Sequence, residues 1–162
     1  MSKIVLSILV ENTSGVLSRV AGLFSRRGYN IDSLTVGVTE KPEFSRMTVV
    51  ASGDDEILEQ IQKQVGKLVD VKSIEVLGDN ESVCRELVLV KVGVTADQRQ
   101  QVISIADIFR AKIVDVSTDS VMVELTGNQV KLNAFISLLD GFDIRQLVRT
   151  GITGLTRGAC EH

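Results

Sequence analysis

The stretch from Val10 to Asp32 constrains the fold of this chain most strongly, because its pattern changes type repeatedly over a short distance. It begins as the end of an apolar strand, breaks at the polar turn Asn-Thr-Ser-Gly (residues 12–15), and continues with apolar residues at helical spacing. Gly28 then suits the left-handed conformation that ends many helices, and a second apolar run follows it. The stretch therefore predicts a strand, a loop, a helix, a second loop and a second strand.

The same alternation of strand and helix patterns continues along the chain. Residues 1–78 predict the order βαββαβ, which is typical of a ferredoxin-like fold with two helices on one face of an antiparallel sheet. A polar run at residues 78–82 suits a linker, and the same order then recurs up to Arg149. We therefore expect an α+β chain of two tandem ferredoxin-like domains, residues 1–78 and 79–162, ending in a glycine-bearing tail from Gly151. The expected strands are 4–10, 31–38, 44–52, 71–77, 86–94, 112–117, 121–126 and 144–149, and the expected helices lie within 16–27, 54–68, 96–110 and 128–139.

The composition argues against several classes of function. The chain has 162 residues, of which 44% are hydrophobic, and this is enough for a packed core. Its formal charge is −3, with acidic and basic residues interspersed, and aromatic residues make up only 4%. It therefore lacks both the basic surface of nucleic-acid-binding proteins and the stacking residues of an RNA-recognition module. No stretch approaches the roughly 20 apolar residues of a membrane span, and the apolar run near Met1 is too short for a signal peptide. We expect a cytoplasmic protein that binds neither nucleic acid nor membranes.

The two cysteines and the single histidine give little support for a metal site or a catalytic centre. Cys84 and Cys160 lie far apart in the sequence without neighbouring metal ligands, so we expect thiols that bind no zinc. An enzyme built on one of these cysteines would need His162 as its base, and the end of a chain holds a base poorly. We therefore expect no catalytic residue, no metal and no cofactor in this chain.

The turn at residues 12–15 places the start of a helix directly after a strand. The first backbone N–H groups of a helix have no partner within it, and the helix dipole makes this end positive. Such an end attracts an anion, and Gly15 lets a ligand approach the backbone because it has no Cβ. We therefore expect a small acidic or zwitterionic ligand at this turn.

Motifs in and around this turn resemble those of a known family. Residues 12–17 (Asn-x-x-Gly-Val-Leu), followed by residues 27–31 (Arg-Gly-Tyr-Asn-Ile), resemble the ligand-binding signature of ACT domains, small βαββαβ modules that bind amino acids. The longer run of residues 11–36 resembles the small regulatory subunit of acetohydroxyacid synthase, also called acetolactate synthase. The resemblance covers essentially the whole chain, with further matches at residues 45–48, 89–92, 108–110, 113–116 and 154–158.

This resemblance implies a regulatory subunit without an active site. In such families the small subunit activates a separate large catalytic subunit, which uses thiamine diphosphate, Mg²⁺ and FAD to condense two 2-oxoacids in valine, leucine and isoleucine synthesis. The small subunit also confers feedback inhibition, usually by valine. The resemblance further implies that ACT domains pair as a homodimer with the effector between protomers, while the second domain helps to engage the catalytic subunit.

The residues of the turn can be assigned to parts of an amino-acid effector. The backbone N–H groups of Gly15, Val16 and Leu17 suit its carboxylate. The side-chain amides of Asn12 and Asn30 can both donate and accept hydrogen bonds, so we expect them to hold the charged end of the ligand. Asn30 would reach the ligand either from the second turn of the same chain or from a second protomer.

Each of these assignments has a purely structural alternative. The side chains of Val16, Leu17 and Ile31 could line a pocket for a branched aliphatic chain, but residues at such spacing equally suit a core. Asn12 and Asn30 are also ordinary turn residues. A difference of one methylene changes binding by only about 1 to 3 kcal/mol. The sequence therefore does not choose among valine, leucine and isoleucine.

A stand-alone amino-acid sensor is the main alternative function. Its first 78 residues would look similar, although no helix-turn-helix or basic DNA-reading helix accompanies them here. In the second domain, residues 95–98 (Thr-Ala-Asp-Gln) stand where the first domain has its Asn-Thr-Ser-Gly turn. We therefore expect no equivalent effector site in the second domain.

Overall fold

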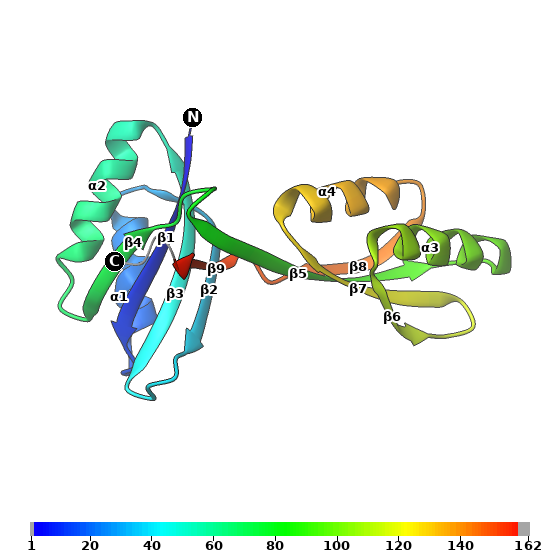
Figure 1. Cartoon of the computed structure of the whole chain (residues 1–162), viewed down its shortest axis with the longest axis horizontal. Coiled ribbons are helices and arrows are strands. Elements are labelled where there is room, and N and C mark those ends of the chain that lie inside the picture. Colours follow the sequence, from blue (N-terminus) through cyan, green and yellow to red (C-terminus); the bar gives the residue numbers. More distant parts are fainter. Residues whose placement is uncertain (1, 159–162) are drawn as a thin grey trace. The chain divides into compact units, whose positions relative to one another are not determined.

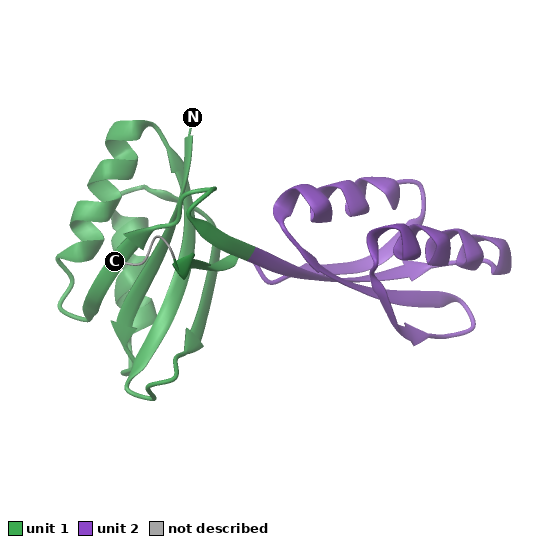
Figure 2. Ribbon diagram, viewed as in Figure 1, with its two compact units in different colours: residues 1–84, 152–162 green, residues 85–151 purple. Residues whose placement is uncertain are grey.

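The computed structural model describes residues 2–158, which form two compact units (Figures 1 and 2). Within the described part of the chain, unit 1 comprises residues 2–84 and 152–158, and unit 2 comprises residues 85–151. Two sequence expectations concern Cys160 and His162, and these residues lie outside the described part.

Unit 1 is an antiparallel sheet with two helices packed on one face. Its strands lie in the order β2-β3-β1-β4, which is the ferredoxin-like arrangement. Alternate residues of the central strands, such as Ile8 and Val49, point toward the helices and pack with Phe24 and Ile61 in a continuous core. The predicted βαββαβ order is confirmed. The elements are β1 (Ser2–Glu11), α1 (Val16–Arg26), β2 (Asn30–Val38), β3 (Phe44–Gly53), α2 (Asp55–Gly66) and β4 (Val71–Val76).

Unit 2 repeats this arrangement with its own core. Its strands lie in the order β6-β7-β5-β8, and all neighbours are antiparallel. Val90 and Val123 of the central strands pack beneath the helices, and the rings of Phe109 and Phe135 meet edge to face at 5.4 Å. The prediction of two tandem ferredoxin-like folds is therefore confirmed. The elements are β5 (Ser82–Gly93), α3 (Ala96–Phe109), β6 (Lys112–Val116), β7 (Ser120–Gly127), α4 (Gln129–Leu138) and β8 (Asp143–Arg149).

The predicted glycine-bearing tail forms part of unit 1. Its strand β9 (Thr153–Thr156) pairs with β5, and the hydroxyl of Thr35 on β2 donates to the carbonyl oxygen of Ile152 at 3.2 Å. Ile152 is buried, with 8% of its surface exposed. A Cβ at Gly154 would lie 2.6 Å from Sγ of Cys84, so the strand can approach this closely only with glycine there.

The bounds of the two compact units differ from those of the two predicted domains. Residues 78–82 are not a free linker, because β5 begins at Ser82 and runs without a break through the junction after Cys84. Residues 152–158 do not belong to the second unit, because β9 pairs with the first residues of β5, on the unit 1 side of the junction. The sequence does not indicate this return, since strand pairing between such distant segments has no local periodicity.

Candidate functional site

The loop between β1 and α1 is anchored to the β2–β3 loop through Asn12. The backbone N–H of Asn12 donates to the carbonyl oxygen of Glu43 at 2.7 Å, and its side-chain amide donates to the carbonyl oxygen of Pro42 at 3.0 Å. One amide hydrogen is therefore used within the chain. The residue is exposed, so its amide oxygen can still accept a hydrogen bond from a ligand ammonium.

The start of α1 differs from the starts of the other helices. Gly15 occupies the N-cap position with a φ of +86°, no side chain caps the helix, and its first turn holds no acidic residue. In contrast, Asp54 caps α2, Thr95 caps α3 and Asn128 caps α4, each through a side-chain oxygen that accepts a backbone N–H. Among the helices of residues 2–158, α1 alone lacks such a cap, which leaves donors at a positive helix end for an external anion.

The three apolar side chains expected to line the effector pocket differ in burial. Val16 is buried in the core of unit 1 with 4% of its surface exposed, and Ile31 packs against the same core. Leu17, one residue further along α1, is 47% exposed. Of the three side chains, Leu17 is therefore the one most accessible to a ligand at the helix start. The backbone N–H of Val16 donates to the carbonyl oxygen of Thr13 at 3.5 Å, a long hydrogen bond.

Asn30 and Ile31 lie at the opposite end of the sheet from the β1–α1 loop. In the strand register, Glu11 is opposite Phe44 and Asn30 is opposite Ser52. Phe44 and Ser52 are eight residues apart on β3, which corresponds to about 27 Å at 3.4 Å per residue. The amide of Asn30 donates there to the carboxylate of Asp32 (2.8 Å) and to the hydroxyl of Ser52 (2.9 Å). A single chain therefore does not bring Asn12 and Asn30 together. This separation excludes a site in which both asparagines come from the same chain, and leaves Asn30 of a second protomer as the other expected arrangement.

Two surface hollows, one in each unit, lie away from the predicted site residues. One in unit 1, of about 380 Å³, lies between residues 35–40 and 153–155 with Arg46. One in unit 2, of about 420 Å³, lies over β5, β7 and β8. Neither is lined by a residue of the β1–α1 loop or by Asn30. These two hollows therefore do not mark the predicted effector site.

An ion pair beneath the loop was not predicted from the sequence. Nε of Arg19 on α1 lies 2.5 Å from Oδ2 of Asp70, and Nη2 of Arg19 lies 3.1 Å from Oδ1 of the same carboxylate. The Asp70 side chain is only 8% exposed. The hydrogen bond from Arg19 and its positive charge lower the pKa of Asp70, although burial acts in the opposite direction. The partners are 51 residues apart, so no local pattern marks them.

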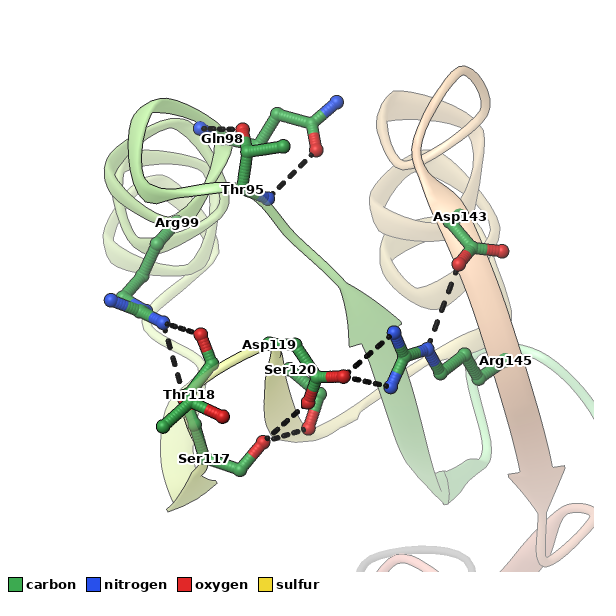
Figure 3. Close-up of polar contacts among 9 residues, drawn as sticks. All are labelled: Thr95, Gln98, Arg99, Ser117, Thr118, Asp119, Ser120, Asp143 and Arg145. Carbon is green, nitrogen blue, oxygen red and sulfur yellow. Dashed lines mark hydrogen bonds and ion pairs between the residues drawn. The ribbon is translucent and has the colours of Figure 1, made fainter.

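The equivalent loop of unit 2 is closed by its own side chains (Figure 3). The Thr95 hydroxyl accepts the backbone N–H of Gln98 at 3.3 Å, and the Gln98 side chain accepts the N–H of Thr95 at 3.0 Å. Nearby, hydrogen bonds from Arg145 and Ser117 lower the pKa of Asp119, with the charge of Arg145 adding to the effect. The side chains of Thr95, Gln98, Ser117, Asp119 and Arg145 at this end of unit 2 are therefore hydrogen-bonded within the unit.

The described residues show no metal-binding cluster and no membrane span. Within residues 2–158, no group of three or more His, Cys, Asp and Glu side chains is placed to hold a metal ion. No helix in the same range has the length and apolar content needed to cross a bilayer.

Comparison with known proteins identifies the class and then the family. The family model described as an AHAS small subunit-like ACT domain matches residues 6–73, so unit 1 carries an ACT domain. The model described as the small subunit of acetolactate synthase matches residues 85–158. The chain belongs to the family of acetolactate synthase small subunits, as the sequence resemblance predicted.

Relatives and a solved structure agree with this assignment. The chain is 49% identical over 156 residues to a probable acetolactate synthase small subunit of Methanothermobacter thermautotrophicus, covering 96% of this chain and 93% of the relative. It is 52% identical over 153 residues to the small subunit of Mycobacterium bovis, covering 94% and 91%. The crystal structure of the small subunit from Thermotoga maritima is 40% identical, with a TM-score of 0.90 over 97% of this chain and 98% of that chain.

Proposed function

We propose that unit 1 senses a branched-chain amino acid, with valine as the first candidate, and that the chain transmits this signal to a large catalytic subunit of acetolactate synthase. The observation that carries the proposal is the uncapped start of α1, since a side chain caps each of the other three helices within residues 2–158. An effector carboxylate would supply the missing cap by accepting the N–H of Leu17 and that of Val16, which would exchange its long 3.5 Å bond to Thr13 for the carboxylate. The exposed Leu17 side chain would then contact the aliphatic part of the effector.

We propose that the effector site is completed by a second copy of the chain. β2 is an edge strand of the unit 1 sheet, and Val38 near its end is 63% exposed. If two β2 edges pair in antiparallel fashion about a two-fold axis near Leu34, Asn30 of one protomer moves toward the Val38 end of the other. The β1–α1 loop lies at that end, since Val38 and Val10 are both opposite Ser45 in the strand register. Pairing would thus unite the two asparagines that lie at opposite ends of the sheet in one chain.

The catalytic chemistry would belong to the partner. The thiamine diphosphate, Mg²⁺ and FAD expected for acetolactate formation would be held by the large subunit, and unit 2 would help to engage it. The small subunit would act in the cytoplasm, where the 2-oxoacids are condensed. A stand-alone amino-acid sensor is the alternative, and it would bind the effector without changing the activity of any large subunit.

Reconstitution tests the proposed function. The purified chain is added to the matching large subunit, and acetolactate formation is measured with and without valine, leucine or isoleucine. We expect a higher rate on addition of the chain, and inhibition by at least one of the three amino acids. A rate and an amino-acid sensitivity that stay unchanged would contradict the regulatory role and favour the stand-alone sensor.

Subunit mixing tests the composite site. An Asn12→Ala chain and an Asn30→Ala chain are co-expressed with different tags, and the heterodimer is isolated by two affinity steps. If each site combines Asn12 of one protomer with Asn30 of the other, the heterodimer holds one intact site and one doubly mutated site. We expect one bound effector per heterodimer and none in either mutant homodimer. Loss of both sites in the heterodimer would show that each site lies within one chain.

A further inference from the structure

We infer that Arg19 and Asp70 position the β1–α1 loop for effector binding without contacting the effector. This inference rests on the proposed function, because it concerns the affinity of that same site. It assigns a role to two residues that belong to neither the ACT signature nor the uncapped helix start.

The Asp70 carboxylate is held in a way that only arginine can match. Nε and Nη2 of Arg19 donate hydrogen bonds to its two oxygens, at 2.5 and 3.1 Å, so the contact is bidentate. A planar guanidinium makes such a contact with a carboxylate, whereas the ammonium of lysine is a single point charge. Since the carboxylate is almost fully buried, it also needs a charged partner, and Arg19 supplies that charge.

The pair touches the loop at both of its ends. At the start of the loop, the backbone carbonyl of Asp70 accepts the N–H of Glu11 at 2.9 Å. At its end, the Arg19 guanidinium lies against the backbone: Nη2 is 3.5 Å from the carbonyl oxygen of Ser14, and Nη1 would be 2.9 Å from a Cβ placed on Gly15. Asp70 thus links the last residue of β1 to the first turn of α1, and the loop lies between these two attachments.

Unit 2 contains a natural comparison. Arg99 is the fourth residue of α3, as Arg19 is the fourth residue of α1. Its Nη2 donates to the carbonyl oxygens of Ser117 and Thr118, at 3.2 and 2.6 Å, and so supports the turn between β6 and β7 (Figure 3). The same helix position therefore carries an arginine in both units. Only in unit 1 is that arginine paired with a buried carboxylate, and only there does the helix start lack a cap.

Arg19 could instead bind the effector carboxylate directly, and the two roles predict opposite results for one variant. In the structure, Nε and Nη2 are used by Asp70, so direct binding would require the pair to open. Removing the charge of Asp70 would release Arg19 and strengthen direct binding. If the pair positions the loop, the same change weakens binding, because the loop loses one of its attachments.

The test compares four variants of the full-length chain: Arg19→Lys, Arg19→Gln, Asp70→Asn and the matched control Arg99→Lys. Binding of valine, leucine and isoleucine is measured by calorimetry well below the melting temperature of each variant, so that every chain is folded. We expect Kd to rise about tenfold or more in Arg19→Gln and Asp70→Asn, because a site loses affinity when the groups that preorganise it are removed. Arg19→Lys should show a smaller rise, and Arg99→Lys should bind as the unmodified chain does.

Three outcomes would overturn the inference. An unchanged Kd in folded Arg19→Gln would leave the pair with a purely stabilising role. A lower Kd in Asp70→Asn would assign Arg19 to direct effector contact. A similar rise in Kd in Arg99→Lys would attribute the effect to a general loss of stability.

A second measurement separates this inference from the proposed function. If the unmodified chain binds none of the three amino acids, the effector proposal fails while the positioning of the loop can still be measured by hydrogen exchange. We expect the backbone amides of residues 11–17 to exchange faster in Arg19→Gln than in the unmodified chain or in Arg99→Lys. Equal exchange rates in these three chains would overturn the positioning role as well.

Discussion

Replacement of Gly15 by aspartate should abolish effector binding while leaving unit 1 folded. Gly15 has a φ of +86°, and an L-residue in the left-handed region costs about 1 to 2 kcal/mol, with aspartate among the better tolerated. The lower flexibility of the unfolded chain offsets part of this cost, by about 0.4 to 1 kcal/mol for Gly→Ala. A new Cβ would lie 2.9 Å from Nη1 of Arg19, the end of a flexible side chain that can move slightly. We therefore expect a loss of only about 1 kcal/mol in the free energy of unfolding.

The expected effect on binding is much larger. The aspartate carboxylate would stand at the helix start where the effector carboxylate is proposed to accept the N–H groups of Val16 and Leu17. Two hydrogen bonds to a charged group contribute about 1.5 to 3 kcal/mol each, so their loss corresponds to a rise in Kd of about 10² to 10⁴. Gly15→Ala adds no charge and should weaken binding far less.

Calorimetry with valine and urea unfolding of the same preparations measure the two quantities side by side. Gly141→Asp serves as the control, because Gly141 also has a positive φ (+112°), lies in unit 2 and has open space around its Cβ position. We expect the control to bind the effector normally. The reasoning would be refuted by an unchanged Kd in folded Gly15→Asp, or by a comparable loss of affinity in Gly141→Asp.

Three further predictions concern the contacts that hold each unit together. Ile152→Ala should lower the free energy of unfolding by about 2 to 3 kcal/mol, as expected for a buried isoleucine. The fluorescence of the chain's single tyrosine, which lies in unit 1, measures this unfolding in urea. An unchanged free energy of unfolding would mean that the returning strand does not support unit 1. Glu86→Gln should lower the free energy of unfolding by about 1.5 to 3 kcal/mol. The buried Glu86 carboxylate accepts hydrogen bonds from the Arg149 guanidinium at 2.7 and 3.3 Å and from the N–H of Gly151 at 3.0 Å. Circular dichroism in urea measures the change, and an unchanged unfolding midpoint would contradict the prediction. Arg19 lowers the pKa of Asp70 in the folded state, so the ionised Asp70 carboxylate stabilises the fold at pH values above its unfolded pKa of about 3.9. This stabilisation is lost as the pH falls from about 3.9 toward the lower pKa of the folded state. Unfolding free energies measured across this pH range should therefore fall less steeply in Asp70→Asn than in the unmodified chain, and equal slopes would exclude a linked Asp70.

Much of the fold could be predicted because its signals are local. The helix from Val16 ends beside Gly28, as the apolar spacing and the glycine indicate, and both βαββαβ repeats follow from strand and helix periods. The turn before α1 could be recognised because an Asn-Thr-Ser-Gly run between a strand and a helix is itself a local pattern.

The candidate site could be predicted only in part. Gly15 and the exposed Leu17 lie at the helix start, as expected, whereas the side chain of Val16 lies in the core. The separation of Asn12 from Asn30 depends on strand register, which the sequence of one loop does not contain. The pairing of Arg19 with Asp70 depends on the same long-range geometry.

The sequence by itself determined the order of the elements, the family and the location of the helix start that no side chain caps, because period, turn chemistry and motif all act within a few residues. Only the tertiary structure decided that the last strand returns to unit 1, that a buried carboxylate supports the β1–α1 loop, and that the two asparagines lie at opposite ends of the sheet. These features arise from contacts between segments tens of residues apart, where the packing of the whole sheet selects the partner. The first stretch of the chain therefore carries one part of the proposed site, and the register of β2 and β3 shows why a second copy is proposed to complete it.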